Sequence, residues 1–403
     1  MVGAPRAKNN GDFGALGRPP IWYLGLFDSM QAQLSLRSRH LMGMALFALI
    51  AVLLIEQIRP LPYQGLVLEP LHRLSARLES IFNAGEHHHG IVAWIVGVGG
   101  LVLVVGGVYA ALAALSPVLA WLWNVGVLYL ALGFRQFSHH FTDIQFALRM
   151  DDLPRARKEL SEWCALPAEG LSASEIARLA IEEALVASHR HVFGVLLCFI
   201  LLPGPCGAIL YRAAAYFADT WGRREQDEES FGVFSRQAFS VIDWLPARAT
   251  AGVFAIVGNF EDAVFCWRNQ VGRWANTPWG RGAGVVLASG AGALGVRLGI
   301  PAGADADEAA EIGVGEPADV DFMQGAVGLV WRSVLLWLAV WLCWRLWRSA
   351  KASVDRLTRY LPRSRLLWLA PLTLGVAVVA LVALIRHPLM PVYGEILLKV
   401  VSR

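Results

Sequence analysis

Residues 231–267 read FGVFSRQAFSVIDWLPARATAGVFAIVGNFEDAVFCW and lie between segments that are apolar enough to cross a membrane. The stretch contains a compact polar set, Asp243-Trp244-Leu245-Pro246-Ala247-Arg248, which is followed by Gly258 and Glu261. Charged residues at membrane depth are rare and mark functional sites by default. We therefore take this stretch as the centre of the chain and interpret the flanking segments around it.

The composition of the chain is that of an integral membrane protein. Of its 403 residues, 56% are hydrophobic and 17% are charged, whereas soluble domains contain about 25% charged residues. Many of the 16 Trp residues lie near the ends of apolar runs, as in the aromatic belts of membrane proteins. We expect an all-α, polytopic integral membrane helical bundle with amphipathic and re-entrant helices.

Charge and cysteine content narrow the range of partners and cofactors. The net charge is only +3, and no basic stripe with interleaved aromatic residues indicates nucleic acid. The expected surroundings are the lipid bilayer, with another membrane protein or a second copy as a possible partner. The five cysteines form no C-x-x-C motif and are expected to be packing residues. The sequence identifies no cofactor.

Long apolar runs predict the membrane segments. Ile91–Phe134 is apolar for 44 residues, which suits a tight hairpin of two spans broken at Ser116-Pro117. The run from Val192 to about Ala218 predicts one span with a kink at Pro203-Gly204-Pro205. Further spans are expected at Leu41–Ile55, Gly325–Trp347 and Leu366–Ile385, and Gly282–Gly299 is a candidate for an extra crossing.

Four regions follow from these segments. They are a disordered basic segment at 1–40, membrane helices at 41–134, a core with polar loops and one kinked span at 135–324, and membrane helices at 325–403. The basic linker at 348–365 and the basic N-terminal segment are both expected inside the cell. Five spans separate them, so the two placements agree only if another segment crosses or one span is re-entrant.

Several pieces of residues 130–316 resemble the CobD/CbiB family, the adenosylcobinamide-phosphate synthases of cobalamin biosynthesis. The matching pieces are ARLAIEEAL at 177–185, GPCGAILYRA at 204–213, WLPAR at 244–248 and GALGVRLG at 292–299. The resemblance implies a membrane enzyme that joins an amino-alcohol, or its phosphate, to a corrinoid carboxylate. Such chemistry needs oxygen ligands for Mg²⁺ and a base for the amine.

The chain departs from the family at these polar motifs. In the family pattern E-x-x-x-E-N-x-x-D, Glu182 is retained, while Val186, Ala187 and Arg190 replace the remaining polar residues. The glycines and apolar positions survive, but most oxygen ligands are lost. The run Asp243-Trp244-x-Pro246-x-Arg248, followed by Gly258 and Glu261, is similar to AmpE, an inner-membrane protein associated with β-lactamase induction.

We therefore expect a remnant polar site rather than a complete synthase site. Its candidate residues are Glu182, Arg224, Asp243, Arg248 and Glu261. Asp243 and Arg248 could form an ion pair, or they could only cap and snorkel at the membrane surface. His189 and His191 are weak candidates for metal ligands, because histidines at an interface more often hydrogen-bond.

Three functions remain open at this stage. The favoured hypothesis is a non-catalytic, AmpE-like role in envelope sensing, since the oxygen ligands are missing. The alternative is an adenosylcobinamide-phosphate synthase with a drifted site, which rests on Glu182, Arg224 and GALGVRLG. The third is a binding or transport protein that kept a pocket for a nucleotide or an amphipathic ligand.

Overall fold

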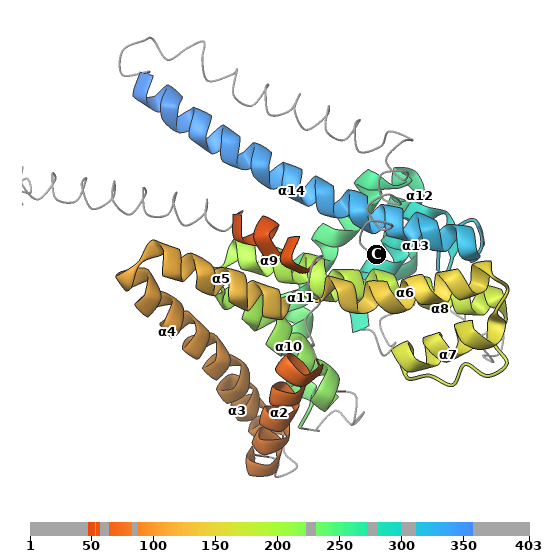
Figure 1. The fold of residues 1–403 in the computed structure, drawn as a ribbon, viewed down its shortest axis with the longest axis horizontal. Helices are drawn as coiled ribbons and strands as arrows, with labels where there is room; N and C mark the ends of the chain where they lie inside the picture. The colour runs from red at the N-terminus through yellow and green to blue at the C-terminus, as the bar shows by residue number, and fades with distance from the viewer. Residues whose placement is uncertain are drawn as a thin grey trace, which may run out of the picture.

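The computed structural model describes residues 47–52, 54–56, 64–82, 87–222, 231–271, 280–299 and 312–357. Helices dominate this part of the chain (Figure 1). Within these described ranges, four helical stretches are long and apolar enough to cross a membrane, which confirms the expected helical membrane protein. They are His88–Leu115, Ala173–Leu201, Val233–Val257 and Val320–Trp344. The segment at 1–40, Arg224 and the span expected at Leu366–Ile385 lie outside the described residues.

The N-terminal part contains the predicted helical hairpin. Helical residues at 47–52 and 54–56, largely within the span expected at Leu41–Ile55, come first. They are followed by η1 (Gln64–Leu68), the amphipathic helix α2 (Glu69–Phe82), α3 (His87–Trp94) and η2 (Ile95–Gly99). The hairpin itself is α4 (Gly100–Leu115) and α5 (Pro117–Ala131). The break at Ser116-Pro117 is confirmed: Ser116 is extended, and its side chain caps α5 by accepting from the Val118 N–H at 3.3 Å.

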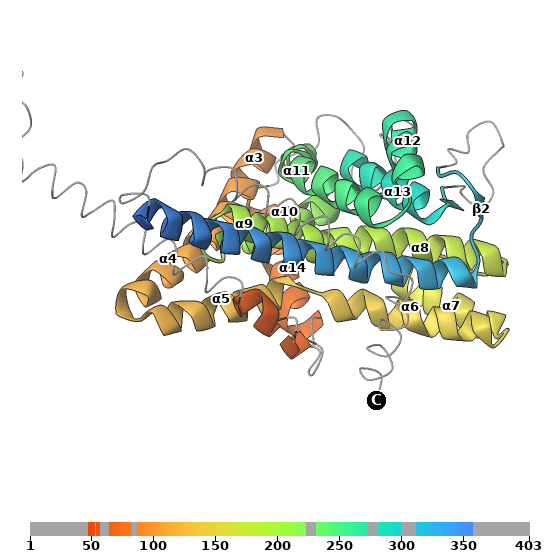
Figure 2. The ribbon, with the colours of Figure 1, turned by 90° about the horizontal axis from the view of Figure 1, so that it is seen from above.

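A polar layer follows the hairpin. It consists of α6 (Phe134–Arg149) and α7 (Leu153–Cys164), which pack against α8 (Ala173–Ser188). The Ser172 and Glu175 side chains form a capping box at the start of α8. Figure 2 shows α6 and α7 at the opposite end of the molecule from the α4–α5 tip.

The kinked span predicted at Val192–Ala218 is wrong. After η3 (His189–Phe193), α9 (Gly194–Leu201) stops, and α10 (Cys206–Gly222) runs back along it. Gly207 lies against the Cys198 carbonyl, and Gly194 lies against the Tyr211 ring, so the two helices are antiparallel. Gly204 has φ +63°, a left-handed conformation that suits glycine. The prolines on either side of it end the helix, and the chain reverses.

The C-terminal part covers the other side of α8. It contains α11 (Val233–Val257), α12 (Phe260–Gln270), α13 (Gly280–Leu294), β1 (Val296–Arg297), β2 (Glu316–Pro317) and α14 (Val320–Leu357). The two short strands pair in parallel. The proposed crossing at Gly282–Gly299 is occupied by α13, whose 15 residues fall short of the about 20 that a crossing needs. From Ala283 to Ala293 its side chains are buried.

Candidate functional site

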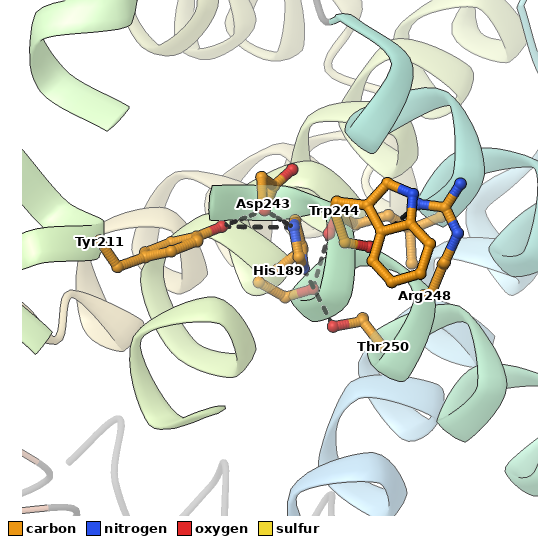
Figure 3. Close-up of polar contacts among 8 residues, drawn as sticks. His189, Tyr211, Asp243, Trp244, Arg248 and Thr250 are labelled. Carbon is orange, nitrogen blue, oxygen red and sulfur yellow. Dashed lines mark hydrogen bonds and ion pairs between the residues drawn. The ribbon is translucent and has the colours of Figure 1, made fainter. Parts of the chain in front are cut away.

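Four buried polar side chains meet between α8, α10 and α11 (Figure 3). The His189 Nε2 atom lies 2.8 Å from Asp243 Oδ1, and the His189 Nδ1 atom lies 3.0 Å from Thr250 Oγ1. The Tyr211 hydroxyl donates to the same Asp243 oxygen at 2.7 Å. All four residues are buried, and His189 is fully inaccessible. We call His189, Tyr211, Asp243 and Thr250 the buried polar network.

Local backbone geometry brings these side chains together. His189 is the first residue of η3, where the α-helix passes into a π-helical turn, a distortion that is frequent at functional sites. Asp243 and Thr250 are seven residues apart on α11 and therefore share one helix face. Gly282 makes room for the carboxylate, since a Cβ there would lie 2.1 Å from Asp243 Oδ2.

The network is chemically suited to holding a charge or moving a proton. A histidine bonded to a carboxylate through one ring nitrogen has a fixed orientation, as in a base held by an acid. Both ring nitrogens of His189 have partners within the protein. In a low-dielectric interior, such a satisfied network is rigid, and the loss of one member leaves a costly unpaired group.

An ion pair lies beside the network. Arg190 Nη1 donates to both carboxylate oxygens of Asp219 at 3.1 Å each. The Arg190 guanidinium also lies 5.7 Å from the centre of the Phe239 ring, within the range of a cation–π contact. Residue 190, where the synthase pattern has an Asp, is therefore an Arg whose charge is neutralised by Asp219 of α10.

Glu182 is buried and holds a backbone segment. Its Oε1 atom accepts from the Gly299 N–H at 2.7 Å and from Arg178 Nη1 at 3.2 Å. Gly299 ends the GALGVRLG segment and has φ +89°. The retained family acid thus ties α8 to the glycine segment that follows α13.

The other predicted site residues lie elsewhere. Arg248 folds back on its own helix, with Nη1 donating to the Trp244 carbonyl at 3.0 Å and the guanidinium 4.2 Å from the Trp244 ring centre. The ion pair considered between Asp243 and Arg248 is therefore wrong, because Asp243 pairs with His189 instead. Glu261 is exposed in the first turn of α12, and Arg224 lies outside the described residues.

The histidines are poorly placed for a metal ion. His189 is bonded to Asp243 and Thr250, and His191 lies near the positive charges of Arg212 and Arg190. Within the described residues, no group of three or more His, Cys, Asp or Glu side chains could hold a metal ion.

The Cys164 and Cys266 thiols, which lie outside the membrane-spanning helices, have low reactivity. Burial, together with the carboxylates of Glu183 and Glu182, raises the pKa of the Cys164 thiol to about 12. Burial and Asp262 also raise the pKa of the Cys266 thiol. Thiols with raised pKa are poor nucleophiles at neutral pH, which agrees with their interpretation as packing residues.

Sequence reasoning missed Tyr211, Thr250 and the Arg190–Asp219 pair. Tyr211 stands alone in an apolar segment, and Thr250 is one small hydroxyl in a helix, so neither attracts attention singly. The spacing of Asp243 and Thr250 on one helix face was the available signal. Their common partner, His189, is 54 residues from Asp243 and 61 from Thr250, which no local pattern reveals.

Comparisons with known proteins agree with the resemblance seen in the sequence. The family model described as CobD/Cbib protein matches residues 41–330. The cobalamin biosynthesis protein CobD of Stutzerimonas stutzeri (strain A1501) is 34% identical over 299 residues, which cover 73% of this chain and 95% of the relative. The cobalamin biosynthesis protein CbiB of Salmonella arizonae is 26% identical over 276 residues, 65% of this chain and 83% of the relative.

A second similarity covers the C-terminus and was not anticipated from the sequence. Residues 325–403 match the model described as inner membrane protein YabI, C-terminal domain. The inner membrane protein YabI of Escherichia coli (strain K12) is 65% identical over 74 residues, 18% of this chain and 29% of that protein. The two family matches overlap at residues 325–330, inside α14. No solved structure shows significant similarity to this chain.

Proposed function

This chain belongs to the CobD/CbiB family, and we propose that it acts in cobalamin biosynthesis as an adenosylcobinamide-phosphate synthase. It is a multi-pass protein of the bacterial inner membrane. The proposed reaction joins an amino-alcohol, or its phosphate, to a carboxylate of a corrinoid. The observation that carries the proposal is the similarity to a CobD protein over 95% of that protein's length.

The buried polar network offers groups that this reaction needs. An amine that attacks an activated carboxyl group must lose a proton. His189 is the base that we assign, because Asp243 bonds to its Nε2 atom and fixes the ring. The Nδ1 atom, which lies 3.0 Å from Thr250 Oγ1, would have to exchange that partner for the amine. Glu182 has a positioning role in this scheme, since it fixes the Gly299 backbone rather than facing a ligand.

Complementation tests the proposal. The full chain is expressed in a bacterial strain that lacks its own CobD/CbiB synthase, and cobalamin-dependent growth is scored. Restored growth is expected for the wild type and for His139→Ala, whose side chain is exposed on α6. The loss of a general base reduces rates by about 10²–10⁴-fold, so His189→Ala should fail to restore growth. Failure of the wild-type chain, once it is detected in the membrane, would count against the enzyme.

A second candidate is a non-catalytic, AmpE-like role in envelope sensing. It is favoured by the Arg190–Asp219 pair, which places a neutralised cation where the synthase pattern has an acid. Val186 and Ala187, which replace two polar residues of that pattern, can neither bind Mg²⁺ nor accept a proton. Deleting the gene should then alter β-lactamase induction without changing cobalamin levels. Unchanged β-lactamase induction together with lower cobalamin levels would exclude this candidate.

A further inference from the structure

We infer that α9 and α10 form a re-entrant hairpin, which enters one leaflet of the bilayer and returns to the side from which it came. The surface that α9 and α10 present at their tip would contact the acyl chains of that single leaflet. This inference concerns the membrane placement of the chain and does not depend on which function is correct.

The chain around the tip has the composition of a membrane-embedded segment. No charged residue occurs between His191 and Arg212. At the tip, Leu201 and Leu202 are exposed, although they are large and apolar, and Pro203 is exposed as well. A tip that reached water on the far side would be expected to carry polar or charged residues, because irregular backbone in hydrocarbon needs partners.

The hairpin is too short to cross. α9 has eight residues, or about 12 Å at 1.5 Å per residue. Counted from His189, the chain advances roughly 18 Å before it reverses. The hydrocarbon core of a bilayer is about 30 Å thick. The hairpin therefore reaches roughly the middle of the membrane.

The preceding helix is held outside the hydrocarbon by its neighbours. α8 packs against α6, α7 and α14, and the start of α8 meets the segment that precedes α14, where Ser174 Oγ donates to the Ala318 carbonyl at 2.7 Å. α6 and α7 expose charged or ionisable side chains such as His139 and Lys158. Exposed ionisable side chains of this kind do not face lipid tails. Although Ala173–Leu201 is long and apolar enough to span, only its last part, η3 and α9, is free to enter the membrane.

Tight packing makes the hairpin one unit. A Cβ on Gly207 would lie 1.9 Å from the Cys198 carbonyl oxygen, and a Cβ on Gly194 would lie 2.1 Å from the Tyr211 ring. The tip also contacts the side of α4, where Gly204 meets Tyr109 and Cys206 meets Gly106. The tip therefore ends six or more residues short of the α4–α5 turn at Ser116.

The open end of the hairpin carries the polar groups. Tyr211, which lies opposite Gly194, joins the buried polar network, and the Arg190–Asp219 pair links η3 to α10 further from the tip. A ligand of this network would thus arrive from one aqueous side.

Spin labels measure this depth directly. Leu202→Cys and Lys158→Cys are each labelled in the full-length chain, which is then reconstituted in bilayers. Oxygen dissolved in lipid and a water-soluble nickel chelate serve as the two relaxation agents. The label at 202 should respond to oxygen and be about tenfold less accessible to nickel than the label at 158, because water is absent from the hydrocarbon core.

Chemical labelling from each side of the membrane tests the same placement in native membranes, without reconstitution. Intact cells and inverted membranes carrying Leu202→Cys are treated with a membrane-impermeant maleimide, and the wild-type signal is subtracted to remove native cysteines. No added labelling from either side is expected. Labelling from the side opposite to Lys158→Cys would show a full crossing, and labelling from the same side would show that the hairpin stays outside. Either result would overturn the inference.

Discussion

The two helical hairpins of this chain, α4–α5 and α9–α10, differ in how closely their helices pack. In the α4–α5 hairpin, α4 has no buried side chain, and a Cβ on Gly100 or Gly107 would meet no atom within 4 Å. In the α9–α10 hairpin, a Cβ added at Gly194 or Gly207 would collide with atoms of the opposite arm. The first hairpin has one largely exposed arm, α4, and one partly buried arm, α5, whereas the second is close-packed between its arms and joined to the buried polar network through Tyr211.

The difference shows how glycine acts in two ways in one membrane protein. In α9–α10 it allows the two helix backbones to approach, as small residues do in membrane helix pairs. On the open face of α4 it leaves a surface that lipid or another protein segment can cover. Stability should therefore be concentrated in the second hairpin, and matched substitutions in the two regions can test this.

The largest effect is expected for Asp243→Ala. Asp243 is a buried carboxylate, and its removal should cost about 3–5 kcal/mol, the range for breaking a buried polar pair, because His189 and Tyr211 both lose their common acceptor. Thermal unfolding in detergent, followed by tryptophan fluorescence, measures the change. Asp143→Ala removes an exposed pair with His139 and should cost at most about 1 kcal/mol. Equal effects would mean that the network does not anchor the hairpin base.

Gly207→Ala should have the next largest effect. The new methyl group would collide with the Cys198 backbone, and overpacking of this kind costs about 1–3 kcal/mol. Gly107→Ala is the matched control on α4 and should stabilise its helix by about 0.5–1 kcal/mol, because alanine favours helix. The shifts in unfolding midpoint should have opposite signs, and shifts of the same sign would remove the contrast between the hairpins.

Trp123→Phe should have the smallest effect. The indole N–H of Trp123 donates to the Val105 carbonyl at 3.2 Å and is a polar tie between α4 and α5. A single neutral hydrogen bond contributes about 0.5–1.5 kcal/mol. The same unfolding assay should show a small downward shift. A loss as large as that of Asp243→Ala would show that the α4–α5 hairpin is also held by polar contacts.

Local sequence signals predicted the first hairpin better than the second. The Ser116-Pro117 break was predictable because a proline at the first helical position needs no hydrogen bond from its nitrogen. Pro203-Gly204-Pro205 is consistent with either a kink or a reversal. The choice depends on whether Gly194 and Gly207 meet the opposite arm, which is a contact between residues distant in the chain.

The candidate site likewise combines residues that the sequence could single out with residues that only the fold brings to them. Glu182 is singled out as the acid retained from the family pattern and Asp243 by the Asp-Trp-x-Pro-x-Arg run, and both are buried. Arg248 and Glu261, singled out by the same reasoning, lie outside the network. The side chains that make Asp243 part of a network, His189 and Tyr211, come from other helices.

The sequence by itself determined that this is a helical inner-membrane protein of the CobD/CbiB type, because hydropathy and short motifs are local properties. Only the tertiary structure decided that the run after His191 doubles back, that Arg190 is neutralised by Asp219, and that His189 rather than Arg248 pairs with Asp243. These outcomes depend on which helix faces meet. That is settled by packing and by the cost of leaving a buried polar group unpaired, and neither is encoded in any single stretch.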